Sequence, residues 1–231
     1  MESYSYLREN LDIVKDTIAR HANGRGDEIT LVAVTKSASD DEVLALAALG
    51  VCDMAENRPQ EVLRRKRMLD DAGYAVRMHE IGHLQTNKVK SILPVTAMIH
   101  SLSSLPLAEE IERRAAALGI RMPVLVEINS AKEESKSGIV PADALRFYEA
   151  VRTFPHLRLC GVMTMGPFSE DPEAIRPYFR LTKKIFDKIG EQYGYETDSP
   201  VLSMGMSDSY GVAAEEGSTL VRVGRRLFVR T

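Results

Sequence analysis

The stretch HEIGHLQTNK at 79–88 contains residues whose types and spacing could do chemistry. Its opening matches the H-E-x-x-H pattern of zinc proteases, in which His79 and His83 would share one helix face and bind one zinc ion. The run is instead typical of a strand, because Gly73 precedes it and Gly82 interrupts it. On a strand the two histidines lie about 13 Å apart at roughly 3.3 Å per residue, too far for one metal. The sequence therefore predicts a strand and no metal site.

Lys36 is a second candidate, because it follows the apolar run LVAVT. A lysine held partly desolvated at the end of a buried strand has a lowered pKa, which frees its amine to form a Schiff base with a carbonyl group. Small residues near the C-terminal end offer hydroxyl and backbone N–H groups to a phosphate; they are Ser203, Gly205, Ser207, Ser218, Thr219 and Gly224. The combination indicates an aldehyde phosphate as ligand. Pyridoxal phosphate and the substrate of a sugar-phosphate aldolase both satisfy that description.

The elements that must position these residues alternate regularly along the chain. An amphipathic helix is predicted at 4–22. Eight short apolar runs are predicted as strands, at 28–36, 51–57, 74–83, 96–102, 122–129, 157–165, 200–206 and 219–224. Helices are predicted after the first seven, at 40–50, 59–72, 84–93, 105–118, 141–153, 172–193 and 208–216.

Strands that are apolar on both faces are typical of a parallel sheet covered by helices. Eight strand–helix repeats predict an α/β fold, a (β/α)8 TIM barrel with an extra N-terminal helix, in a single domain over 1–231. A doubly wound open sheet is the alternative, but it usually has a glycine-rich turn after its first strand, where this chain has TKSAS. Active sites of barrels lie at the carboxyl ends of the strands, where the sequence places Lys36, Asn57, His83, Ser203 and Gly224.

Composition excludes several classes of function. The 231 residues are 44% hydrophobic and 27% charged, and the net charge of -3 gives no basic footprint for nucleic acid or for an anionic membrane. No apolar run approaches the roughly 20 residues that span a bilayer. The polar start MESYSYLREN has no signal-peptide core, so we expect a cytoplasmic protein. Cys52 and Cys160 each lie in an apolar stretch and are expected to be small buried core residues.

Eight motifs, in order along the chain, resemble the pyridoxal phosphate homeostasis proteins. They are LVAVTK, AENRPQE, IGHLQTNK, IHSLSS, EESKSG, GVMTMGP, LSMGMSDSY and EGSTLVRVG. That family is similar in fold to the barrel domain of alanine racemase, the third fold type of pyridoxal phosphate proteins. The resemblance implies pyridoxal 5'-phosphate as cofactor, held as a Schiff base by Lys36, with Asn57 and His83 beside its ring.

The resemblance also implies how the two ends of the cofactor are bound. Ser203 and the backbone at Gly224 and Arg225 would hold the phosphate, and Arg222 would face the pyridine nitrogen. A guanidinium keeps its proton at neutral pH, so Arg222 disfavours a proton on that nitrogen and leaves the ring a weak electron acceptor.

The chain departs from the family pattern at a few positions. Ala55 stands where the family usually has Gly, and residues 37–39 read SAS where a Pro-containing segment is common. Arg225 and Arg226 replace small or polar residues. These departures bear on loop geometry and phosphate affinity, whereas the lysine and the ring-facing residues are kept.

Two functions from different classes follow. The first is a pyridoxal phosphate carrier that serves intracellular vitamin B6 and amino-acid homeostasis without a defined turnover, with apo-enzymes that require the cofactor as candidate partners. The alternative is a pyridoxal phosphate-dependent amino-acid racemase. Racemases of this fold take a second acid/base, a tyrosine, from a separate β domain that we do not expect here, and Tyr210 is expected to pack at a helix start. A one-base site racemises poorly, so the sequence favours the carrier, as a monomer.

Lys136 lies in the loop EESKSG and has two interpretations. It is either a solvated loop lysine or a secondary attachment point or gate for departing cofactor.

Overall fold

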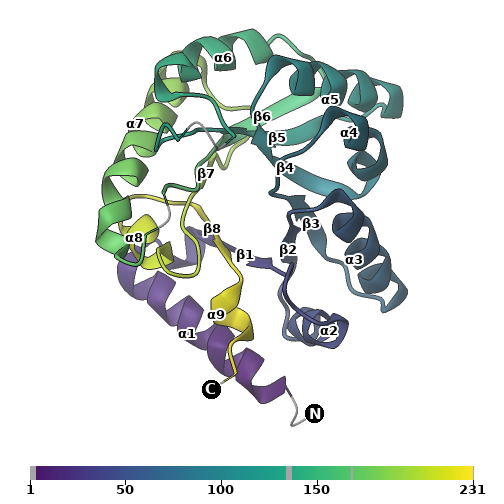
Figure 1. The fold of residues 1–231 in the computed structure, drawn as a ribbon, viewed down its shortest axis with the longest axis vertical. Helices are drawn as coiled ribbons and strands as arrows, with labels where there is room; N and C mark the ends of the chain where they lie inside the picture. The colour runs from purple at the N-terminus through teal and green to yellow at the C-terminus, as the bar shows by residue number, and fades with distance from the viewer. Residues whose placement is uncertain (1–3, 134–136, 168, 231) are drawn as a thin grey trace.

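Eight parallel strands pair in chain order, and the last pairs with the first, so the sheet closes into a barrel (Figure 1). The computed structural model describes residues 4–133, 137–167 and 169–230. The strands are β1 (Thr30–Val34), β2 (Asp53–Glu56), β3 (Arg77–Glu80), β4 (Thr96–Leu102), β5 (Met122–Glu127), β6 (Leu157–Met163), β7 (Val201–Ser203) and β8 (Leu220–Val223). The predicted (β/α)8 barrel is confirmed, and the open sheet is excluded.

An α-helix follows each strand and lies on the outside of the barrel (Figure 1). These helices are α2 (Asp40–Ala48), α3 (Pro59–Asp71), α4 (Thr86–Ile92), α5 (Leu105–Leu118), α6 (Ala144–Val151), α7 (Arg176–Tyr193), α8 (Tyr210–Glu215) and α9 (Arg225–Phe228). Short 3-10 helices are η2 (Gly26–Glu28), η3 (Leu93–Val95), η4 (Pro141–Asp143) and η5 (Pro172–Ile175). The sequence did not predict α9, because four residues are too few to show a helical period.

The strands are apolar on both faces because each face has its own packing. On β5, Val124 and Val126 pack in the large cluster beneath the outer helices. Leu125, between them, belongs to a separate cluster with Cys160 and Met163. Because successive strand residues point to opposite faces, Glu127 shares the inward face of Leu125. Polar residues at such inward positions are therefore enclosed by the barrel.

The extra N-terminal helix is α1 (Ser5–His21), which packs against α8 and α9. Its buried side chains are Leu7, Asn10, Leu11, Val14 and Ile18, at helical spacing. The Asn10 amide donates hydrogen bonds to the carbonyl oxygens of Leu227 (3.1 Å) and Val229 (2.8 Å). This helix thus fixes the segment that follows β8.

Every strand except β4 ends one to three residues earlier than the sequence predicts, and two of these ends bear on candidate site residues. β1 ends at Val34 because the chain turns there, with the Ala38 N–H donating to the Thr35 carbonyl at 2.9 Å. β3 ends at Glu80, whose carboxylate accepts from the Gly82 N–H at 2.8 Å. Lys36 and His83 therefore lie in loops beyond the strand ends.

One packing prediction is wrong. Cys160 is buried as expected, but Cys52 is exposed, because it lies in the loop just before β2 rather than within the strand. Among the described residues, no helix is both long and apolar enough to cross a membrane.

Candidate functional site

The end of β1, two residues before Lys36, lies against the turn that follows β8. Strand β1 pairs with β8, with Val32 opposite Arg222. At Gly224 an added Cβ would come within 3.0 Å of the Val34 carbonyl oxygen, so glycine permits this turn to lie directly against the end of β1. The Lys36 side chain is exposed, contrary to the partial burial that we expected from the sequence. An exposed lysine therefore lies at the rim, two residues beyond the contact between β1 and the β8–α9 turn.

Backbone donors of that turn gather around the hydroxyl of Ser207. The Ser207 Oγ lies 3.2 Å from the Gly224 N–H and 3.5 Å from the Arg226 N–H, both of which donate toward it. The Arg225 side chain is exposed and forms an ion pair with Asp208. A hydroxyl and several N–H groups at one point make a site that suits a phosphate.

Ser203 occupies a different environment from Ser207. It is the last residue of β7 and is fully buried inside the barrel. Its Oγ accepts from Arg222 Nη1 at 2.5 Å and lies 3.2 Å from His100 Nδ1. The role implied for Ser203 at a phosphate remains a prediction; of the two serines, Ser207 is the one in contact with Gly224.

Arg222 is a buried cation in the barrel interior. Its Nη2 donates to the Thr164 carbonyl at 3.0 Å, in addition to the bond with Ser203. Burial lowers the pKa of Arg222 to about 10, and the carboxylate of Glu127 acts in the opposite direction. The guanidinium nevertheless keeps its charge at neutral pH.

Asn57 and His83 lie in the loops after β2 and β3, and both are exposed. These loops touch closely, since a Cβ at Gly82 would come within 2.1 Å of the Asn57 carbonyl oxygen. His83 Nδ1 lies 3.0 Å from the hydroxyl of Ser137, in the loop after β5. The glycine at 82 therefore fixes where Asn57 and His83 stand at the rim.

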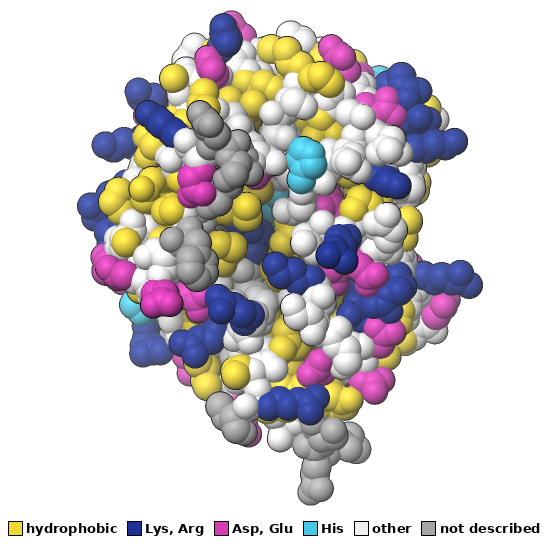
Figure 2. Space-filling model, viewed as in Figure 1, with side chains coloured by type: hydrophobic (Ala, Val, Ile, Leu, Met, Phe, Trp, Pro, Cys, Tyr) yellow, Lys and Arg dark blue, Asp and Glu magenta, His cyan; other side chains and the backbone are white. Residues whose placement is uncertain are grey.

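The predicted site residues occupy one continuous arc of the barrel. They come from β7, β8, β1, β2 and β3 or from the loops that follow, and these strands are neighbours in the closed sheet. Figure 2 shows Lys and Arg side chains near the middle of one face of the molecule. Positive charge around an opening attracts anionic ligands.

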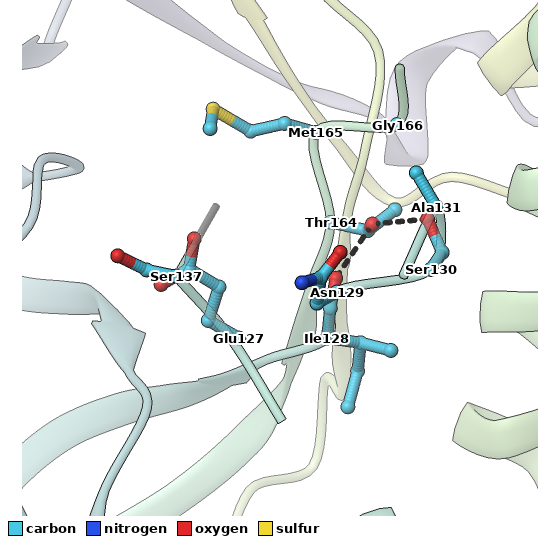
Figure 3. Close-up of a pocket in the computed structure, with 9 residues that line it drawn as sticks. All are labelled: Glu127, Ile128, Asn129, Ser130, Ala131, Ser137, Thr164, Met165 and Gly166. Atoms are coloured by element: carbon cyan, nitrogen blue, oxygen red, sulfur yellow. Dashed lines mark hydrogen bonds between the residues drawn. The ribbon is translucent and has the colours of Figure 1, made fainter. Parts of the chain in front are cut away.

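A small pocket lies in a different part of the rim, at the ends of β5 and β6 (Figure 3). Its lining includes Glu127 and the hydrogen-bonded pair Ser130 and Thr164, whose hydroxyl oxygens are 2.8 Å apart. Thr164 donates to the Ile128 carbonyl at 2.9 Å, so it accepts from Ser130. None of the predicted site residues lines this pocket, but two of its lining residues contact them, since Ser137 bonds to His83 and the Thr164 carbonyl accepts from Arg222.

Other residues singled out in the sequence have plainer positions. Ala55 is buried among the inward residues of β1 and β8, where its methyl group fills space. Tyr210 is the first residue of α8 and packs in the hydrophobic core, as predicted. Lys136 lies outside the described residues.

The sequence missed a chain of buried polar groups behind Ser203. His79, to which we assigned no chemistry, contacts His100 and Asp53. Asp53 and His79 point to the same, inward face of the paired strands β2 and β3. This shared face could have indicated the contact, but it follows only from the alignment of the two strands.

The family model of the alanine racemase N-terminal domain matches residues 4–230. The pyridoxal phosphate homeostasis protein of Aquifex aeolicus is 38% identical over 206 residues, which are 89% of each chain. The structure of PipY from Synechococcus elongatus with pyridoxal phosphate bound is 26% identical, with a TM-score of 0.79, over 92% of this chain and 100% of that one. An alanine racemase of Clostridium difficile shares the fold, with a TM-score of 0.78 at 17% identity, over 98% of this chain and 60% of that one.

Proposed function

This chain belongs to the pyridoxal phosphate homeostasis proteins, which are built on the alanine racemase N-terminal domain, and from that premise we propose that it binds pyridoxal 5'-phosphate through Lys36. It would do so as a cytoplasmic, monomeric carrier in a single domain over 1–231. The observation that supports this proposal is the close approach of Gly224 to Val34, because it sets the turn that carries the Gly224 N–H against the end of β1, two residues before the exposed Lys36.

The donor set around Lys36 fits this cofactor. When bound, pyridoxal phosphate supplies an aldehyde that reacts with a primary amine, and a phosphate that needs several N–H and O–H donors. Lys36 supplies the amine. Ser207 and the backbone at Gly224 and Arg225 would supply donors for the phosphate, and Ser203 lies deeper, at the end of β7. Asn57 and His83 stand on the remaining side of the arc, where they would flank the ring.

Arg222 favours storage of the cofactor over turnover. Facing the pyridine nitrogen, its guanidinium would donate a hydrogen bond and oppose protonation of that nitrogen. The ring would then withdraw electrons weakly, which disfavours racemisation. Tyr210, the candidate for a second acid/base, packs in the hydrophobic core. The name of the relatives, a homeostasis protein, agrees with a carrier that supplies apo-enzymes and serves amino-acid homeostasis.

Titration of the cofactor-free protein with pyridoxal phosphate tests this proposal. We expect a yellow protein whose visible absorption band is lost in Lys36→Ala and kept in Lys90→Ala, which removes an exposed lysine of α4. A colourless protein after titration would contradict cofactor binding. Steady interconversion of D- and L-amino acids that requires Lys36 would instead favour the racemase.

A further inference from the structure

A line of buried polar side chains crosses the barrel interior and ends at Arg222. His79 Nε2 lies 3.0 Å from a carboxylate oxygen of Asp53, and His79 Nδ1 lies 2.9 Å from His100 Nε2. His100 Nδ1 lies 3.2 Å from the Oγ of Ser203, which is 2.5 Å from Arg222 Nη1. All five residues are buried. They come from β2, β3, β4, β7 and β8, and the line begins at Asp53, the first residue of β2.

At the Asp53 end of the line, the direction of the hydrogen bond is fixed. Burial acts to raise the pKa of Asp53, but hydrogen bonds from His79 and from Arg77, together with the charge of Arg77, outweigh it and lower the pKa to about 2. Asp53 is therefore a carboxylate, which can only accept hydrogen bonds. It follows that His79 carries a proton on Nε2 and donates it to Asp53.

The Arg222 end has a fixed direction as well. A guanidinium has donors and no acceptor, so Arg222 donates to the Ser203 oxygen. Burial lowers the pKa of His100 far below its usual range, and the charge of Arg222 acts in the same direction. His100 is therefore neutral, with one nitrogen that donates and one that accepts.

Only one arrangement satisfies every group along the line. If His100 donated to Ser203, the serine oxygen would receive two donors, and its own proton would have no acceptor among the contacts of the described residues. If Ser203 donates to His100 instead, His100 Nε2–H donates to His79 Nδ1 and each group has a partner. The bonds then all run in one direction, from Arg222 to Asp53.

We propose that this directional chain is a positioning device for Arg222, which it holds in one orientation toward the ring of the cofactor. The positioning residues are Asp53, His79, His100 and Ser203. The orientation toward the ring rests on the proposed function, whereas the direction of the bonds is a property of the protein with or without cofactor. Because the hydroxyl proton of Ser203 is committed to His100, its oxygen lone pairs face Arg222.

Among the described residues, charged groups act on both ends of this line of hydrogen bonds. Arg77 on β3 pairs with Asp53 at 2.5 Å and is the exposed end of the line. Glu127 on β5 acts on Arg222, where its charge raises the pKa of the guanidinium. Thr164, which follows β6, supplies the second acceptor for the guanidinium through its carbonyl oxygen. Arg222 is thus held at two points, by Ser203 at the end of β7 and by Thr164 just after β6.

Nitrogen-15 NMR of the histidine rings tests the direction directly. At pH 8, in protein both with and without pyridoxal phosphate, we expect His79 and His100 each to carry a single proton, on Nε2. Assignment follows from the loss of each signal in His79→Gln and His100→Gln. A proton on Nδ1 of His100, or on both nitrogens of His79, would overturn the proposed direction.

Two substitutions at His100 test the effect on the cofactor. His100→Gln keeps one acceptor and one donor, whereas His100→Leu removes both. We expect the leucine variant to bind pyridoxal phosphate on the order of tenfold more weakly and to shift the pH midpoint of the visible band, with glutamine restoring most of both. His156→Gln, which removes a partly exposed histidine bonded to Glu112, is the control and should match wild type.

The outcomes separate the two proposals. If the wild-type protein has no visible band, the proposed function fails. The NMR tautomers still test the direction of the hydrogen bonds between Arg222 and Asp53. If wild type is yellow and folded His100→Leu has the same band, midpoint and affinity, the positioning role is wrong. Should His100→Leu fail to fold, Asp53→Asn tests the same chain from its far end, and an unchanged midpoint there counts against the proposal.

Discussion

Two serines four residues apart, Ser203 and Ser207, show how strongly the position of a residue decides its chemistry. Ser203 ends β7 inside the barrel and bonds to a guanidinium, whereas Ser207 lies in the following loop against the backbone of Gly224. The sequence identified both as small polar residues near a phosphate site. Residue type could not separate them, because their surroundings depend on where β7 ends, and the resemblance implied a phosphate role for Ser203 alone.

Alanine substitutions distinguish the two serines. Ser207→Ala should weaken pyridoxal phosphate binding by about 1–1.5 kcal/mol, the usual value of one hydrogen bond, and make inorganic phosphate a poorer competitor. Ser203→Ala should instead shift the pH midpoint of the visible band. Ser91→Ala, which removes an exposed hydroxyl on α4, is the control. Equal effects of Ser203→Ala and Ser207→Ala on phosphate competition would mean that both serines hold the phosphate.

The sequence predicts the alternating order of strands and helices. It does not predict the residues at which the strands end. Apolar runs and helical periods mark where elements exist. Loop geometry depends on close approaches between elements distant in the chain, such as Gly82 on Asn57 and Gly224 on Val34. Those contacts decide where Lys36 and His83 stand, so their surroundings became known only from the structure.

Gly82→Ala tests one of these approaches. Its Cβ would lie 2.1 Å from the Asn57 carbonyl oxygen, so the β2 and β3 loops must separate. We expect a loss of about 1–3 kcal/mol in the free energy of unfolding, measured by urea denaturation, together with weaker cofactor binding. Gly211→Ala, whose Cβ would make an ordinary 3.5 Å contact with His21, is the matched control and should be neutral or slightly stabilising. A wild-type free energy of unfolding for Gly82→Ala would show that the loops adapt freely.

The molecule as a whole buries an unusual set of ionisable groups on the two faces of its sheet. Burial, with a contribution from Glu56, raises the pKa of Glu80 to about 7, although the Gly82 N–H donates to it. Burial also raises the pKa of Glu127 to about 7. The periodicity of single strands does not reveal such groups. An acidic residue at the end of an apolar run is equally consistent with an exposed loop, and its burial depends on the closed barrel.

The pH dependence of stability follows from Glu80. Its folded-state pKa lies above the ordinary value of 4.5, so its stabilising contribution is complete below that pH and is lost as pH rises through about 7. The free energy of unfolding should therefore fall between pH 5 and 8, by on the order of 1–3 kcal/mol from this group. Glu80→Gln, which keeps an acceptor for Gly82, should reduce the slope, and Glu149→Gln on the exposed face of α6 should not. An unchanged slope in Glu80→Gln would mean that Glu80 titrates normally.

The most direct test of Lys36 as the attachment point is chemical. Borohydride reduction of the protein loaded with pyridoxal phosphate should fix the cofactor on one lysine, and peptide mass mapping should locate it on Lys36. A reduced adduct on Lys36 with loss of the visible band is the predicted result. No adduct, or an adduct spread over other lysines with Lys36 unmodified, would contradict it.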